Sequence, residues 1–165
     1  MTKNWTITEK SISLILIIWS CLLAYSGIHS LVTIINMLSW DNVSLPLTIK
    51  NYHLLILPPI VSVIAGLLLF FNSKIGWAIS VIALLLNGLM YLIPARKYTH
   101  FYSKSNLELI FFSALVTILS ITLALILIQK PFIEKYRPNK KTWLTIIAIT
   151  TIVLVDRAII YFTSI

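Results

Sequence analysis

Long apolar runs alternate with short polar segments along this chain, and that pattern predicts its secondary structure. Each run is about 20 residues long, which is what an α-helix needs to cross roughly 30 Å of hydrocarbon at about 1.5 Å per residue. We therefore expect a single polytopic domain over residues 1–165. Its helices should cover approximately residues 11–38, 52–71, 75–93, 107–128 and 142–163.

The second and third runs are separated only by the polar turn Asn72-Ser73-Lys74. A connection of this length leaves no room for a further domain, so the two helices should be antiparallel neighbours. Pro58 and Pro59 fall near the middle of the second run and remove two backbone N–H donors, so we expect a kink there.

Composition agrees with a chain that faces lipid. Hydrophobic residues make up 59% of the sequence and charged residues 11%, whereas a soluble domain has roughly 25% charged residues. The predicted fold class is an all-α integral membrane protein, a bundle of four to five transmembrane helices with short loops. The single cysteine, Cys21, excludes an intramolecular disulfide and is expected to be a packing residue.

The uncertainty between four and five helices lies in the last run. Residues 142–165 contain twelve Leu, Ile, Val or Phe residues, which together favour insertion by roughly 4 to 7 kcal/mol. Asp156 and Arg157 oppose insertion by about 2.5 to 3.5 kcal/mol each, so the sum is near zero. We expect this helix to cross with both charged side chains turned towards protein or water.

The distribution of Lys and Arg predicts the orientation. Cytoplasmic loops retain positive charge during insertion. A cytoplasmic N-terminus places eight basic residues inside, namely Lys3, Lys10, Lys74, Lys130, Lys135, Arg137, Lys140 and Lys141. Four are then outside, namely Lys50, Arg96, Lys97 and Lys104. The expected location is the plasma or inner cell membrane, with the N-terminus cytoplasmic.

Small and polar residues repeat at helical spacing on the third and fourth runs, and such stripes allow membrane helices to pack closely. The predicted packing seam comprises Gly76, Ser80, Ala83, Asn87 and Tyr91 on one helix and Ser113, Thr117, Ser120 and Ala124 on the next. The seams could form the interior of a bundle within one chain or an interface between subunits.

Four polar residues have similar depths in the expected bundle, and we hypothesise that they form one buried cluster: His29, Asn87, Asp156 and Arg157. Ionisable groups inside a membrane are costly, so they often mark an ion path, a proton relay or a ligand site. The alternative is structural, with Asp156 and Arg157 acting as paired charges that hold the last helix in the bundle.

No catalytic motif accompanies this cluster. The sequence contains no zinc-binding His-Glu-x-x-His, no Gly-x-Ser-x-Gly elbow and no phosphate-binding loop. We expect no metal site and no cofactor. The net charge of +8 lies mainly in short loops, which is typical of contact with anionic lipid and not of nucleic-acid binding.

The basic linker between the fourth and fifth runs is the expected surface for lipid or for a partner protein, through Lys130, Lys135, Arg137, Lys140 and Lys141. The function that the sequence favours is a non-enzymatic membrane protein, acting as an oligomer or as the membrane subunit of a larger complex with another membrane or cytosolic protein. An ion-conducting or membrane-perturbing assembly, as in bacterial defence or immunity, is one form of this. The alternatives are a membrane-embedded enzyme acting on lipid and a small transporter subunit.

Overall fold

The computed structural model describes residues 3–38, 45–92 and 106–163. Its helices are α1 (Lys3–Leu38), α2 (Leu45–Phe70), α3 (Lys74–Leu92), α5 (Asn106–Leu127), α6 (Lys130–Tyr136) and α7 (Lys140–Thr163). No strand occurs within the described ranges, so the prediction of an all-α fold is confirmed.

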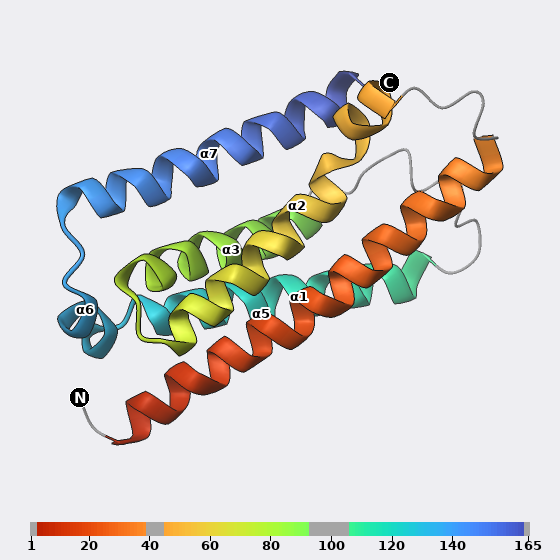
Figure 1. Ribbon diagram of the computed structural model, residues 1–165. Helices are drawn as coiled ribbons and strands as arrows, with labels where there is room; N and C mark the ends of the chain where they lie inside the picture. The colour runs from red at the N-terminus through yellow and green to blue at the C-terminus, as the bar shows by residue number, and fades with distance from the viewer. Residues whose placement is uncertain (1–2, 39–44, 93–105, 164–165) are drawn as a thin grey trace.

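Helix α3 lies at the centre of the packing. It contacts α2, α5 and α7, whereas α1 packs against α2 (Figure 1). Successive long helices run in opposite directions, so the start of α1, the α2–α3 turn, α6 and the start of α7 gather at one end of the molecule. We call this the basic end, defined by Lys10, Lys74, Lys130, Lys135, Arg137, Lys140 and Lys141.

The α2–α3 turn explains why the hairpin predicted from the sequence forms. Asn72 adopts the left-handed conformation, with φ of 58°. Its N–H donates to the Leu69 carbonyl and the Ser73 N–H donates to the Leu68 carbonyl, at 2.9 and 3.0 Å. These two bonds close α2 in a Schellman motif. The Ser73 hydroxyl then accepts the Gly76 N–H at 3.3 Å, so the same residue caps the start of α3.

Two helices begin earlier than the sequence predicts. Helix α1 starts at Lys3, about eight residues before the apolar run, because side chains in the polar lead make tertiary contacts with α6. Helix α2 starts at Leu45, where Pro46 falls in the first turn. Proline is tolerated at that position because the N–H that it lacks has no partner in a helix. Helix α2 also continues through Pro58 and Pro59.

The linker before α7 contains a helix that the sequence analysis does not predict. Gln129 occupies the N-cap position of α6 and accepts the Ile133 N–H through its backbone carbonyl, and Pro131 stands in the first turn. Arg137, the C-cap residue that follows α6, has φ of 43°, in the left-handed region. Its N–H donates to the Ile133 carbonyl at 2.8 Å. Helix α7 begins two residues after Pro138, where the Asn139 side chain accepts the Thr142 N–H at 2.8 Å.

The outer surface is strongly apolar. Large hydrophobic side chains are exposed on every long helix, including Leu22 on α1, Leu67 on α2, Ile118 on α5 and Ile152 on α7. By length and composition, two helical segments are suited to cross a membrane, Trp5–Thr33 and Lys140–Ile159, and the bent pair Ala114–Leu127 with Lys130–Tyr136 makes a third if it forms one span.

Two further apolar stretches, Leu57–Phe70 and Lys74–Leu89, are between 10 and 17 residues long. By this measure the described residues contain two or three candidate spans, and the four to five spans expected from the sequence stay a prediction. The apolar surface and these helices indicate membrane association.

Candidate functional site

A buried carboxylate joins three parts of the chain at the basic end. Glu9 on α1 has no exposed surface, and both of its oxygens are bonded to α6. The Tyr136 hydroxyl donates to Oε1, and the Lys135 ammonium forms an ion pair with Oε2. Lys135 also donates to the Asn72 side-chain oxygen at 2.6 Å. This Glu9–Lys135 contact therefore ties the start of α1, the α2–α3 turn and α6 together.

Aromatic rings surround this contact. Trp77 on α3 is fully buried, and its indole N–H donates to the Leu127 carbonyl at the end of α5, at 2.8 Å. Its ring stacks on Tyr136 with centroids 5.9 Å apart and meets the edge of Trp143 on α7 at 5.7 Å. Trp77 therefore joins α3 to α5, α6 and α7, while a second pair, Trp5 on α1 and Phe132 on α6, packs edge to face at 5.6 Å.

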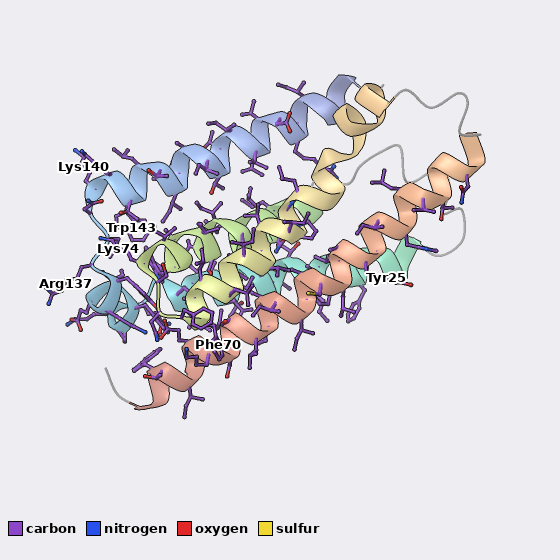
Figure 2. All side chains as sticks on the ribbon, in the orientation of Figure 1. Tyr25, Phe70, Lys74, Arg137, Lys140 and Trp143 are labelled. Carbon is purple, nitrogen blue, oxygen red and sulfur yellow. The ribbon has the colours of Figure 1, made fainter. Side chains whose placement is uncertain are left out.

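Most of the remaining cations of the basic end are exposed, whereas Lys10 is half-buried and donates to the Phe70 carbonyl. Figure 2 shows Lys74, Arg137 and Lys140 at this end of the molecule, with Trp143 beside them. The Lys74 ammonium donates to the Arg137 carbonyl at 2.9 Å, which links the start of α3 to the end of α6. Lys130 forms only an exposed pair with Glu134, 3.8 Å apart. Such pairs contribute little to stability.

Inside the bundle, polar side chains bond across the α1–α2, α2–α3 and α3–α5 contacts. The Ser13 hydroxyl on α1 donates to the Gly66 carbonyl on α2 at 2.6 Å. Ser80 on α3 donates to the Ala65 carbonyl on α2 at 3.1 Å, and Thr117 on α5 donates to the Gly88 carbonyl on α3 at 3.0 Å. In an apolar surrounding these bonds satisfy the hydroxyls and fix helix register.

The residues of the predicted packing seam lie along these contacts. The α3 residues Gly76, Ser80 and Asn87 contact α2, and Ala83 is buried with them. On α5, Thr117 bonds to α3, and Ser120 and Ala124 are buried. The side chains of Tyr91 and Ser113 lie outside the described residues.

The four residues of the hypothesised polar cluster occupy different surroundings. Asn87 is buried and donates to the Ser62 hydroxyl at 3.2 Å, which in turn donates to the Pro58 carbonyl at 2.8 Å. His29 is exposed and stacks on Tyr25 with ring centroids 6.3 Å apart. Asp156 and Arg157 are half-buried on α7 and each makes a polar interaction. A single cluster of all four therefore stays a hypothesis.

The sequence analysis assigned no role to Glu9 or to Trp77. A signal for Glu9 was present, because it falls at helical spacing with the buried residues Ile12, Ser13 and Leu16. Likewise, Phe132 and Tyr136 are four residues apart after a proline, which is the pattern of one buried face on a short helix. Their distant partners could not be read from the sequence.

Taken together, these features define an all-helical, membrane-associated protein. Its described charged side chains, apart from Asp156 and Arg157, lie at one end. Among the described side chains, no group of three or more His, Cys, Asp or Glu residues could hold a metal ion. Comparison of the chain with protein-family models, curated proteins and solved structures finds no match in any of the three.

Proposed function

We propose that this chain is a non-enzymatic integral membrane protein that works as the membrane subunit of an assembly. In this proposal α1, α2, α3, α5 and α7 all cross the cell membrane. Helices α2, α3 and α5 contain 26, 19 and 22 residues. At about 1.5 Å per residue they reach roughly 39, 28 and 33 Å, which is enough for a hydrocarbon layer of about 30 Å.

The basic end supports a cytoplasmic N-terminus. Seven of the eight basic residues that the sequence assigns to the inner face define this end, and the α1 helix starts there at the eighth, Lys3. Positive charge gathered at one end of a membrane bundle favours that end remaining in the cytoplasm.

The low burial of helix α7 within the chain is the observation that supports an assembly. Only 11% of its apolar segment Lys140–Ile159 is buried within the chain, compared with 28% for Trp5–Thr33 of α1. Among the described α7 side chains, only Ile146 and Thr150 are buried. Helix α7 packs mainly against α3, and the rest of its surface faces away from the bundle (Figure 1).

Lipid is an unfavourable environment for the polar residues on the surface of α7 that faces away from the bundle. Thr145 and Thr151 are exposed, and Asp156 and Arg157 are only half-buried. A charged side chain near the centre of a membrane helix costs about 2.5 to 3.5 kcal/mol in lipid. A second protein surface against α7 would lower that cost. Inside the bundle, Ser13, Ser80 and Thr117 donate to carbonyls of neighbouring helices, whereas the buried hydroxyls of Ser20 on α1 and Thr150 on α7 have no hydrogen-bond partner among the described residues.

Disulfide crosslinking at matched alanines tests the proposal. Ala148 on α7 and Ala114 on α5 are both exposed helical residues. In a Cys21→Ser background, Ala148→Cys should give a crosslinked species on oxidation in native membranes, and Ala114→Cys should not. The mass of the detergent-solubilised protein then separates an oligomer of this chain from a complex with another membrane protein.

A monomeric mass with no co-purifying protein, together with no crosslink at position 148, would refute the assembly. Extraction of the protein by alkaline carbonate without detergent would refute the membrane-spanning part. Equal crosslinking at positions 114 and 148 would show random collision and contradict the role given to α7.

A further inference from the structure

The basic end holds cations that the fold does not use. Glu9 neutralises Lys135, and Glu134 lies beside Lys130. Arg137, Lys140 and Lys141 are exposed, and no acidic residue occurs in the sequence between Arg137 and Asp156. The linker from α6 to α7 therefore presents a concentrated positive surface.

Helix α6 lies at one end of the bundle, directly after the last turn of α5. It is bent by 57° from the end of α5. One face, formed by Phe132 and Tyr136, is buried against the bundle, while Lys130, Glu134 and Arg137 are exposed. Trp143, half-buried in the first turn of α7, packs on the core residue Trp77, which stacks on Tyr136 of α6. Trp side chains are enriched near the ends of membrane helices, at the interface with water.

From this arrangement we infer that the basic end binds the anionic headgroups of phospholipids in the leaflet that surrounds it, through Arg137, Lys140 and Lys141. The inference rests on the proposed membrane location. It adds a specific ligand class, a phosphate-bearing anionic lipid, to a surface held in place by two contacts. These are the Glu9–Lys135 contact, which fixes α6, and the bond from Lys74 to the Arg137 carbonyl, which fixes the linker.

Charge complementarity and position favour lipid over a soluble anion. Arg137 follows α6 directly, and Lys140 and Lys141 begin α7, so all three would face headgroups once the long helices are inserted. Each Lys or Arg near an anionic surface contributes about 1 kcal/mol, which is roughly fivefold in affinity. Three cations acting together therefore give up to about a hundredfold preference before screening by salt.

The test uses the full chain in detergent micelles with mixed lipid, and counts bound lipids by native mass spectrometry. Wild type should retain phosphatidylglycerol at least tenfold more than phosphatidylcholine. The variant R137Q/K140Q/K141Q should lose most of that preference, whereas R137K/K140R/K141R should keep it. The matched control K50Q/K97Q/K104Q removes the same charge from positions that the sequence assigns to the opposite face, and it should keep the preference.

Each variant's thermal midpoint in phosphatidylcholine alone establishes that it is folded. Loss of preference in the control as well as in the R137Q/K140Q/K141Q variant would overturn the inference, because net charge alone would then explain binding. Equal competition by millimolar inorganic phosphate would overturn the assignment to lipid, as would capture of an acidic protein in place of lipid. Failure of wild type to partition into membranes would instead refute the proposed function.

Discussion

Glu9, in the second turn of α1, and Lys135, in the last turn of α6, form an ion pair across 126 positions of sequence. The carboxylate is completely buried and the lysine side chain is 23% exposed. A buried charge that loses its partner destabilises a protein by about 3 to 5 kcal/mol, whereas replacing both partners with neutral groups costs far less. The pair can therefore be tested as a unit.

We expect Lys135→Met to be the most damaging single change at this contact, because it leaves the Glu9 carboxylate buried with only the Tyr136 hydroxyl beside it. The expected loss is about 3 kcal/mol of unfolding free energy. Glu9→Gln should cost less, since Lys135 can reach water. The double variant should be more stable than Lys135→Met alone, as measured by unfolding in mixed micelles with increasing SDS.

The exposed ion pair between Lys130 and Glu134 is the control for these variants of Glu9 and Lys135. Its side chains are 86% and 67% exposed. Lys130→Met should therefore change the unfolding free energy by no more than about 0.5 kcal/mol. If Lys130→Met and Lys135→Met are equally destabilising, the Glu9–Lys135 contact does not hold α6 in place.

Helices α2 and α3 approach each other closely at Gly76. A Cβ atom there would lie 2.4 Å from the Leu68 carbonyl carbon and 2.6 Å from the Leu69 nitrogen. Backbone atoms cannot turn aside as a side chain can, so Gly76→Ala should force the hairpin apart at a cost of about 1 to 3 kcal/mol.

Gly88→Ala is the matched comparison for Gly76→Ala. The nearest atom to a Cβ at position 88 is the Ile121 Cγ1, a movable side-chain atom 3.0 Å away. We therefore expect a cost under about 1 kcal/mol. SDS unfolding of both variants measures the difference, and a Gly88→Ala variant as unstable as Gly76→Ala would contradict the close approach at Gly76.

The hairpin was predictable from the sequence because its determinants are local. The polar turn Asn72-Ser73-Lys74 lies between two apolar runs, and a left-handed Asn followed by a capping Ser is a common way to end one helix and begin another. The spacing of Gly76, Ser80 and Asn87 likewise indicates one helix face, although the spacing alone does not say which helix it meets.

The Glu9–Lys135 contact was not predictable in the same way. The hydrophobic pattern places the start of α1 near Ser11, so Glu9 falls outside the apolar run. Its burial depends on the distant residues Lys135 and Tyr136, and no local rule connects them. The prediction of a cluster around His29, Asn87 and Asp156 rests on their depth in the expected bundle. Depth gives the position of a residue along its helix, but it does not give the face of the helix from which the side chain projects.

Neutral substitutions of Asp156 and Arg157 test whether these charged residues of α7 contribute to the assembly. We expect Asp156→Asn and Arg157→Gln each to lower the assembled fraction in detergent, because each removes a charged group that makes a polar interaction on a weakly buried helix. The double variant should recover part of the loss if the two charges act as a structural pair. Size-exclusion chromatography with light scattering measures the fraction. Normal assembly of both single variants would indicate that neither charge serves the interface.

Arg137 separates a backbone effect from a charge effect at the basic end. Its φ of 43° is unfavourable for any residue with a Cβ atom, by about 1 kcal/mol, and its side chain is exposed. Arg137→Gly should therefore raise the unfolding free energy by about 0.5 to 1 kcal/mol in zwitterionic micelles, while lowering the preference for anionic lipid. Arg137→Gln should lower that preference equally without any gain in stability, since it keeps the Cβ atom.

The two bonds at this residue use only its N–H and its carbonyl, so both variants retain them. If Arg137→Gly is no more stable than Arg137→Gln, the left-handed end of α6 is not strained.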